Sequence, residues 1–209
     1  MLRPASPNDV ERIAEIWQRG WRDGHLGHVP EALVAVRGAS SFRTRALERM
    51  DATMVVDIDG AVVGFVTVID DEVEQVYVSK EHRGRGVGDL LLTQAEHLVG
   101  AGGHRRAWLA VVSGNARARR FYARNGWVDE GLFDYPADAV TGPVLVPCHR
   151  YIKPVATRQH RRGVAAPPSG HSGPVGGGFS DRRRPPTAPR RELCDEGRHG
   201  PQEGTAARG

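Results

Sequence analysis

The sequence predicts an α/β domain with a mixed, mostly antiparallel sheet flanked by helices, followed by a disordered tail. Two β-rich runs, Thr53 to Ile58 and Ala61 to Ile69, flank an Asp-Gly pair, which is a strong signal for a two-residue hairpin turn. A strand at Glu72 to Ser79, a helix, and an apolar strand at Arg106 to Val112 form a β-α-β unit, whose two strands should run parallel. Residues 155–209 are rich in Pro, Gly and Arg and poor in large aliphatic side chains, which is typical of disorder.

The other elements follow from helical periodicity, capping residues and turn signals. Before the hairpin we expect an edge strand at Leu2 to Pro4, a helix capped by Ser6 or Asn8, a loop from Trp21 to Val29, and a helix from about Pro30 to Met50 that breaks near Gly38. The hairpin and the β-α-β unit come next, and the helix of that unit runs from about Gly88 to Val99. After them we expect a helix capped by Asn115 and closed by Gly126, and two last strands at Trp127 to Asp129 and Pro147 to Lys153. The folded domain is therefore predicted to span residues 1–154, with the tail at 155–209.

The positive charge of the chain is concentrated in the tail. The whole chain carries a net charge of +4, while residues 155–209 hold ten Arg against five Asp or Glu, so the first 154 residues are nearly neutral. A neutral core does not favour nucleic-acid binding by the folded domain. The tail either binds acidic surfaces weakly or is a passive extension.

Cysteine usage and hydropathy place the protein in the cytoplasm. Cys148 and Cys194 form no Cys-x-x-Cys pair and have no nearby His cluster, so we expect two free thiols and no metal. The N-terminal segment is too charged for a signal peptide, and no apolar run approaches the roughly 20 residues of a membrane span.

The most informative segment is the loop that joins the strand ending at Ser79 to the next helix. It places Gly84, Gly86 and Gly88 at alternate positions directly before that helix. Glycines let backbone amides approach a ligand closely, and the first N–H groups of a helix have no internal partners. Together they form an anion site suited to a pyrophosphate, and Arg83 and Arg85 add positive charge.

Two nucleotide-binding motifs do not fit this loop. A P-loop ends in Gly-Lys-Ser/Thr, which Val87-Gly88-Asp89 lacks, and a Rossmann fingerprint requires Gly-x-Gly-x-x-Gly, whereas these glycines are spaced two and two. A flexible turn or a basic RNA-binding segment is the plain alternative.

Arg83, Gly86 and Gly88 match the signature Gln/Arg-x-x-Gly-x-Gly/Ala, with a Val-x-Val strand before it and three leucines after it. In these features the chain resembles the GNAT superfamily of acetyl-CoA-dependent N-acetyltransferases, over about residues 1–154. The resemblance implies a GNAT-like sheet with splayed central strands and acetyl-CoA as co-substrate. It also implies which residues bind the coenzyme: amides of Arg83, Gly84, Arg85, Gly86, Val87 and Gly88 for the pyrophosphate, and Val76, Tyr77 and Val78 for the pantetheine arm.

The spacing of valines before the loop indicates an irregular strand. Val73, Val76 and Val78 step by three and then by two, and one extra residue near Glu74-Gln75 would restore the alternation, which is a β-bulge. A strand buried on both faces is the alternative. The resemblance favours the bulge, and a free amide near Val76 would then polarise the thioester carbonyl.

The segment Asn115 to Trp127 resembles the second signature of the family, an Asn cap followed by Phe-Tyr and Asn-Gly-Trp. The resemblance implies that Tyr122 is the general acid for the leaving thiolate and that Asn115 binds the pantetheine arm. The plain alternatives are that Asn115 only caps its helix and that Phe121 and Tyr122 pack in the core. We take Phe121 as packing and Tyr122 as functional.

For the general base, Glu72 and Glu74 lie on the strand beside the expected thioester. Glu72 matches the position of the family's glutamate better by counting back from Arg83, whereas a bulge would redirect Glu74. Strand carboxylates more commonly face solvent, and Tyr77 is a further polar candidate.

The acceptor pocket is expected between the first two helices, where Trp21, His25 and His28 gather, while Trp17 is assigned to the core. His25 and His28 have metal-like spacing but lack a third ligand. We therefore predict acetyl transfer from acetyl-CoA to a primary amine, of a small molecule or a peptide N-terminus, by direct attack, with no membrane or nucleic-acid partner for the core and with a homodimer left open. The alternative is a non-catalytic acyl-CoA-binding module.

Overall fold

A computed structural model describes residues 1–139 and 142–157 of the chain. The predicted disordered tail lies outside the described residues from position 158 onward, so the domain limit at residue 154 stays a prediction. Among the described residues, no helix combines the length and the apolar character needed to cross a membrane.

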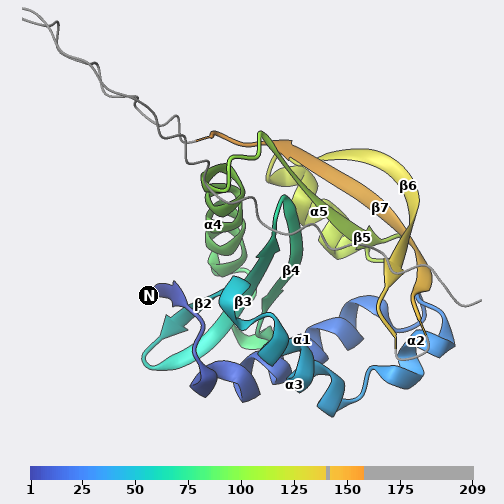
Figure 1. Ribbon diagram of the computed structural model, residues 1–209, viewed down its shortest axis with the longest axis horizontal. Coiled ribbons are helices and arrows are strands. Elements are labelled where there is room, and N and C mark those ends of the chain that lie inside the picture. The colour runs from blue at the N-terminus through green and yellow to red at the C-terminus, as the bar shows by residue number, and fades with distance from the viewer. Residues whose placement is uncertain (140–141, 158–209) are drawn as a thin grey trace, which may run out of the picture. The chain divides into compact units, whose positions relative to one another are not determined.

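The fold is a seven-stranded mixed sheet with the strand order β1-β2-β3-β4-β5-β7-β6. The strands are β1 (Leu2–Pro4), β2 (Thr53–Ile58), β3 (Ala61–Ile69), β4 (Glu72–Val78), β5 (Arg106–Val112), β6 (Val128–Ala137) and β7 (Val144–Pro154). Every neighbouring pair is antiparallel except β4 and β5, which are parallel. The predicted hairpin and the parallel β-α-β unit are therefore confirmed (Figure 1).

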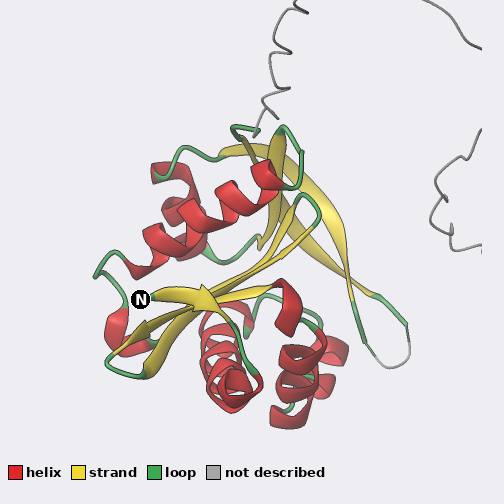
Figure 2. Ribbon diagram, turned by 60° about the vertical axis from the view of Figure 1, so that its left-hand side comes forward, coloured by secondary structure: helices red, strands yellow, loops and turns green. Residues whose placement is uncertain are grey.

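Helices cover both faces of the sheet (Figure 2). They are α1 (Val10–His25), α2 (Glu31–Val36), α3 (Ala39–Glu48), α4 (Val87–Ala101) and α5 (Ala116–Arg124). One core cluster joins α1 and α3 to the sheet through Trp17, Phe42 and Phe65, and the other joins α4 to the sheet through side chains such as Leu91 and Leu109. The predicted break at Gly38 is present between α2 and α3.

The sheet opens in its middle, where β4 meets β5. Their recorded pairing consists of Glu72 with Trp108 alone, after which the two strands diverge (Figure 1). On its other edge, β4 pairs Gln75 with Thr67 and Val73 with Val68, so Glu74 is the extra residue of a β-bulge. The bulge predicted from the valine spacing is confirmed, and it accompanies the splay that makes room for a ligand.

The predicted loop at Trp21 to Val29 is wrong in its first half, because α1 continues to His25. Two glycines inside this helix misled the prediction, since glycine costs a helix interior about 1 kcal/mol relative to alanine. Their places are set by packing: a Cβ on Gly20 would overlap the Tyr77 ring, and one on Gly24 would lie 2.6 Å from Asn115 Nδ2. The close approach of α1 to β4 and to the start of α5 requires both glycines.

The last two strands are much longer than predicted. We expected strands at Trp127 to Asp129 and Pro147 to Lys153, whereas β6 and β7 form a long antiparallel hairpin. The side chains of β6 are exposed or only partly buried, so its sequence shows little of the apolar alternation that identifies a strand. Pairing with β7, with a register shift beside Gly131, holds it in the sheet.

Candidate active site

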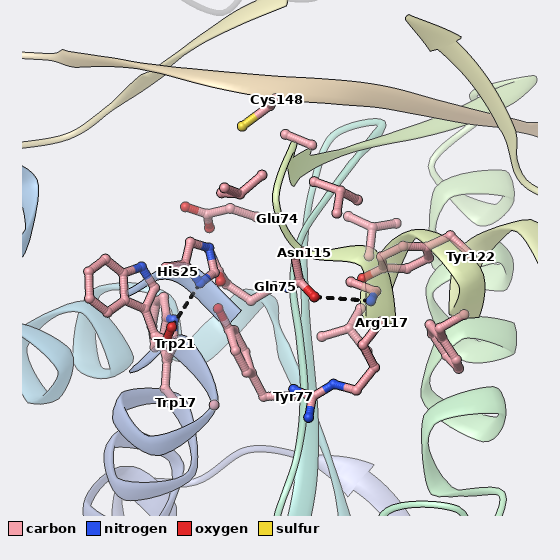
Figure 3. A pocket seen from close by; sticks show the side chains of 18 of the residues that line it. Trp17, Trp21, His25, Glu74, Gln75, Tyr77, Asn115, Arg117, Tyr122 and Cys148 are labelled. Carbon is pink, nitrogen blue, oxygen red and sulfur yellow. Dashed lines mark hydrogen bonds between the residues drawn. The ribbon is translucent and has the colours of Figure 1, made fainter. Parts of the chain in front are cut away.

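A pocket of about 520 Å³ occupies the opening between β4 and β5 and extends toward α1 (Figure 3). Most of the residues predicted for the site line it: Trp21, His25, Glu72, Glu74, Val76, Tyr77, Val78, Arg83, Gly84, Gly86, Gly88, Asn115 and Tyr122. Three predicted residues do not line it, namely His28, Arg85 and Val87.

One end of the pocket is the glycine loop in front of α4. Gly84 and Gly86 have φ angles of 75° and 80°, in the left-handed region that other residues rarely adopt, and Gly86 is the N-cap of α4. The first amides of α4 therefore open toward the loop without internal partners, at the positive end of the helix dipole. This arrangement suits a pyrophosphate.

The arginines of the loop differ in their surroundings. Arg83 donates to the Val78 carbonyl at 3.3 Å and pairs with Asp23 of α1 at 2.8 Å, so it fixes the loop to the first helix. Arg85 is exposed. Val87 is buried in the core beneath α4, so only its backbone is available to a ligand at the loop.

Tyr122 lies across the pocket from α1, on α5, with its hydroxyl directed inward (Figure 3). Its ring packs against Trp127 and Tyr151, with ring centroids 6.2 and 6.0 Å apart, and burial raises the pKa of the phenol well above its ordinary value. The hydroxyl therefore keeps its proton at neutral pH, as a general acid requires.

Asn115 is the cap of α5, since its Oδ1 accepts a hydrogen bond from the Ala118 amide at 3.1 Å. The plain capping role is thus confirmed. Its Nδ2 faces Gly24 of α1 at the wall of the pocket, and the residues described give this amide nitrogen no acceptor. The side chain therefore caps the helix with one atom and leaves the other for a ligand.

The two candidate bases have opposite environments. Glu72 accepts a hydrogen bond from the Tyr135 hydroxyl at 3.0 Å, and burial raises its pKa to about 7. Glu74, with a side chain only 8% exposed, is paired to Arg49 at 2.9 Å and lies 3.7 Å from Arg45. Glu72 therefore exchanges a proton near neutral pH, whereas Glu74 is committed to holding α3 against the sheet.

His25 is the last residue of α1 and lines the pocket. Its ring stacks on Trp21 with centroids 5.1 Å apart, and Nδ1 donates to the Trp21 carbonyl at 2.9 Å. Burial lowers the pKa of His25 to about 4, so the ring is neutral at physiological pH. His28 is exposed and its ring lies against Gly114, and the described part of the chain has no group of three His, Cys, Asp or Glu residues placed to hold a metal.

The pocket residues that were not predicted include Arg37, Arg45, Tyr135 and Cys148. They come from α2, α3 and the β6–β7 hairpin, which contain no recognisable motif, so no local signal was available to find them. Burial raises the pKa of Cys148 to about 12, so this thiol stays protonated and is no nucleophile at neutral pH.

The splayed sheet, the glycine loop and the single pocket that this loop lines together with Tyr122 and Glu72 are typical of an α/β domain of the acetyltransferase type. The model of the acetyltransferase (GNAT) family matches residues 10–127, more than half of the chain, and the chain belongs to this family. An uncharacterised N-acetyltransferase of Archaeoglobus fulgidus is 29% identical over 134 residues, covering 58% of this chain and 88% of the relative. One of Mycobacterium bovis is 27% identical over 109 residues, covering 50% and 70%.

Solved structures agree with this fold. A GCN5-related N-acetyltransferase from Rhodopseudomonas palustris has a TM-score of 0.58 at 23% identity, covering 74% of this chain and 95% of that one. The PaiA N-acetyltransferase from Thermoplasma acidophilum, in complex with coenzyme A, has a TM-score of 0.52 at 19% identity over 74% and 98%. The putative acetyltransferase yncA from Salmonella typhimurium, with acetyl-CoA, has a TM-score of 0.55 at 20% identity over 81% and 98%.

Proposed function

We propose that the protein transfers an acetyl group from acetyl-CoA to a primary amine, of a small molecule or a peptide N-terminus, by direct attack in a ternary complex. The observation that supports this best is that one pocket is lined by the glycine loop, by Tyr122 and by Glu72. It thus joins an anion site to an acid and a base. The similar structures with coenzyme A and acetyl-CoA bound support the choice of donor.

The donor is held mainly by backbone groups. The amides of Arg83 to Gly88 bind the pyrophosphate, assisted by the charge of Arg83 and Arg85. The pantetheine arm lies along the edge of β4 at Val76 to Val78, which has no recorded pairing with β5, and reaches Asn115 Nδ2. The thioester then lies in the opening between the two strands.

The reaction needs a neutral amine, a polarised carbonyl and a proton for the leaving thiolate. Glu72 removes a proton from the ammonium group of the acceptor through a water molecule. The amine nitrogen attacks the thioester carbon while the amide of Val76, beside the bulge, stabilises the developing oxyanion. The carbon–sulfur bond breaks with its electron pair on sulfur, and Tyr122 gives its proton to that thiolate. The nitrogen then loses its surplus proton through water to the Tyr122 phenolate, which leaves a neutral amide and a protonated tyrosine.

The test is an acetylation assay across a panel of amines that follows the release of free coenzyme A thiol. We expect turnover with at least one primary amine, and retention of that turnover when residues 155–209 are removed, because acetyl transfer belongs to residues 1–154. Binding of coenzyme A without turnover on any amine would instead support a non-catalytic binding module. Loss of activity on removal of the tail would contradict the domain limit. We also place the protein in the cytoplasm, where acetyl-CoA is available.

A further inference from the structure

Arg37 is a charged residue of the pocket that has no function in the proposed reaction. Arg37 follows the last turn of α2, is half-buried, and lines the pocket together with His25 and Leu33. Its Nη2 donates to the backbone carbonyl of Asp138 at 2.7 Å. That bond uses a neutral acceptor and leaves the other N–H groups of the guanidinium without a partner among the described residues.

The neighbouring arginines, unlike Arg37, have carboxylate partners. Arg45 and Arg49 share the carboxylates of Glu74 and Asp138, at N–O distances between 2.9 and 3.7 Å. Arg37 has no carboxylate within 4.0 Å in the described parts of the chain. Arg49 also lies 3.8 Å from Glu48. Both neighbouring arginines therefore have carboxylate partners, whereas Arg37 has none among the described residues.

An unpaired guanidinium in a half-buried position is unfavourable. Burial, and then the repulsion from Arg45, lowers the pKa of Arg37 below its ordinary value. A carboxylate supplied by a ligand offsets this cost, because it accepts two parallel hydrogen bonds from the planar guanidinium. The same positive charge repels a polycationic amine.

Arg45 and Asp138, which pair with each other, are charged neighbours of Arg37, and several other residues around it are apolar or neutral. Trp21, Leu33, Phe42 and Val146 line this end of the pocket, and the ring of His25 is uncharged at neutral pH. We propose that Arg37 binds the carboxylate of the acceptor, so that the substrate is a short amino carboxylate with an apolar side chain, in the manner of an α-amino acid. This inference rests on the proposed acetyl transfer to an amine.

The test compares matched acceptors. Alanine, valine, leucine and phenylalanine are each compared with the corresponding amide and with the amine that lacks the carboxylate. We expect kcat/KM to be at least about tenfold higher for the preferred amino acid than for its two counterparts without a carboxylate, since one charge-assisted hydrogen bond is worth about a tenfold to hundredfold change.

Variants then test whether Arg37 causes the preference for acceptors with a carboxylate. Arg37→Met keeps an unbranched apolar stem and removes the guanidinium, so the ratio of kcat/KM for the amino acid to kcat/KM for the amine without a carboxylate should fall by about tenfold or more. Arg37→Lys should keep part of the ratio. Arg43→Met is the matched control, because Arg43 is an exposed arginine of α3 that pairs with Glu11 and does not line the pocket. A merely structural effect of Arg37→Met would lower kcat/KM equally for the substrates with and without the carboxylate, and would leave the ratio of the two values unchanged.

Calorimetry separates this inference from the proposed function. The binding of the same amino acids is measured with coenzyme A present, for the wild type and for Arg37→Met. Binding that is lost in Arg37→Met, without acetylation of any amine, would reject the transferase function and keep the carboxylate site. Acetylation without preference for the carboxylate, or with a preference that Arg37→Met does not change, would reject the carboxylate site alone. Neither binding nor acetylation would reject both.

Discussion

The two ends of the pocket are built in different ways. The donor end comes from one stretch of sequence, β4 through α5, and presents mostly backbone amides and a glycine loop. The acceptor end is assembled from α1, α2, α3 and the β6–β7 hairpin, and presents side chains whose partners are far apart in sequence, as in the hydrogen bond from Arg37 to Asp138. In the proposed function, local conformation therefore holds the donor, and tertiary packing holds the acceptor.

This difference has a consequence for mutation. A change at the donor end should affect every acceptor equally, since all use the same coenzyme. A change at the acceptor end should alter the choice of amine and leave coenzyme A affinity unchanged.

The largest effect is expected at Tyr122, where the two ends meet. Tyr122→Phe removes the proton donor and leaves the ring packed against Trp127 and Tyr151. We expect kcat to fall by about 10² to 10⁴ for all acceptors, the usual range for a lost general acid, with coenzyme A affinity and thermal stability unchanged. Steady-state kinetics and calorimetry measure these quantities. Full turnover in this variant would show that another group, or water, protonates the thiolate.

The two glutamates of β4 should respond differently. Glu72→Gln should lower kcat/KM by about 10² and abolish its rise with pH around 7, because the carboxylate form is the base and it accumulates only above the raised pKa of about 7. Glu74→Gln should leave the pH profile in place and lower the free energy of unfolding by about 2 kcal/mol, since Arg49 loses the nearest of its ionic partners. A pH–rate profile and a denaturant titration of both variants measure the contrast. If Glu74→Gln alone removed the pH dependence, the assignment of the base would be reversed.

Local signals in the sequence predicted most of the donor end. The Asp-Gly turn, the alternating glycines, the Asn115 cap and the step of three from Val73 to Val76 each act over a few residues, and the structure has the corresponding hairpin, loop, cap and bulge. The predicted roles of these residues with the coenzyme remain proposals. The sequence predicted the backbone conformation that these proposed roles require.

The acceptor end was predicted poorly because its determinants are long-range. Gly20 and Gly24 indicated a loop, whereas packing against Tyr77 and Asn115 keeps them helical. Tyr135 reaches Glu72 across 63 positions of sequence, from a strand that alternation did not reveal. A contact of this kind leaves no pattern near either residue, so it could not be found before the fold was known.

A substitution in the glycine loop should have a smaller effect, which is confined to the binding of coenzyme A. Gly86→Ala places a Cβ at a φ of 80°, which costs about 1–2 kcal/mol, and puts a methyl group where the amides face the pyrophosphate. We expect coenzyme A affinity to weaken by about tenfold, with the ranking of acceptors unchanged. Gly60→Ala is the matched control, because Gly60 has a φ of 79° in the β2–β3 turn and does not line the pocket. Calorimetry with coenzyme A compares the two, and equal loss of affinity in both would mean that strain alone is responsible.

The smallest effect is expected at Tyr135, which tests whether the β6–β7 hairpin tunes the base. The hydrogen bond from Tyr135 stabilises the carboxylate of Glu72 and so opposes the rise of its pKa that burial causes. Tyr135→Phe should therefore raise the pKa of Glu72 above 7, by about one unit for the loss of a single hydrogen bond from a neutral donor to the carboxylate.

Because the base form is then scarcer at neutral pH, kcat/KM of Tyr135→Phe should fall a few-fold at pH 7 and recover to the wild-type value at about pH 9. The pH–rate profile of this variant, measured beside Glu72→Gln, checks this. A loss that persists at high pH would assign Tyr135 to substrate contact. An unchanged pH–rate profile would mean that the β6–β7 hairpin does not influence the pKa of Glu72. The acceptor end would then affect only the binding of the amine.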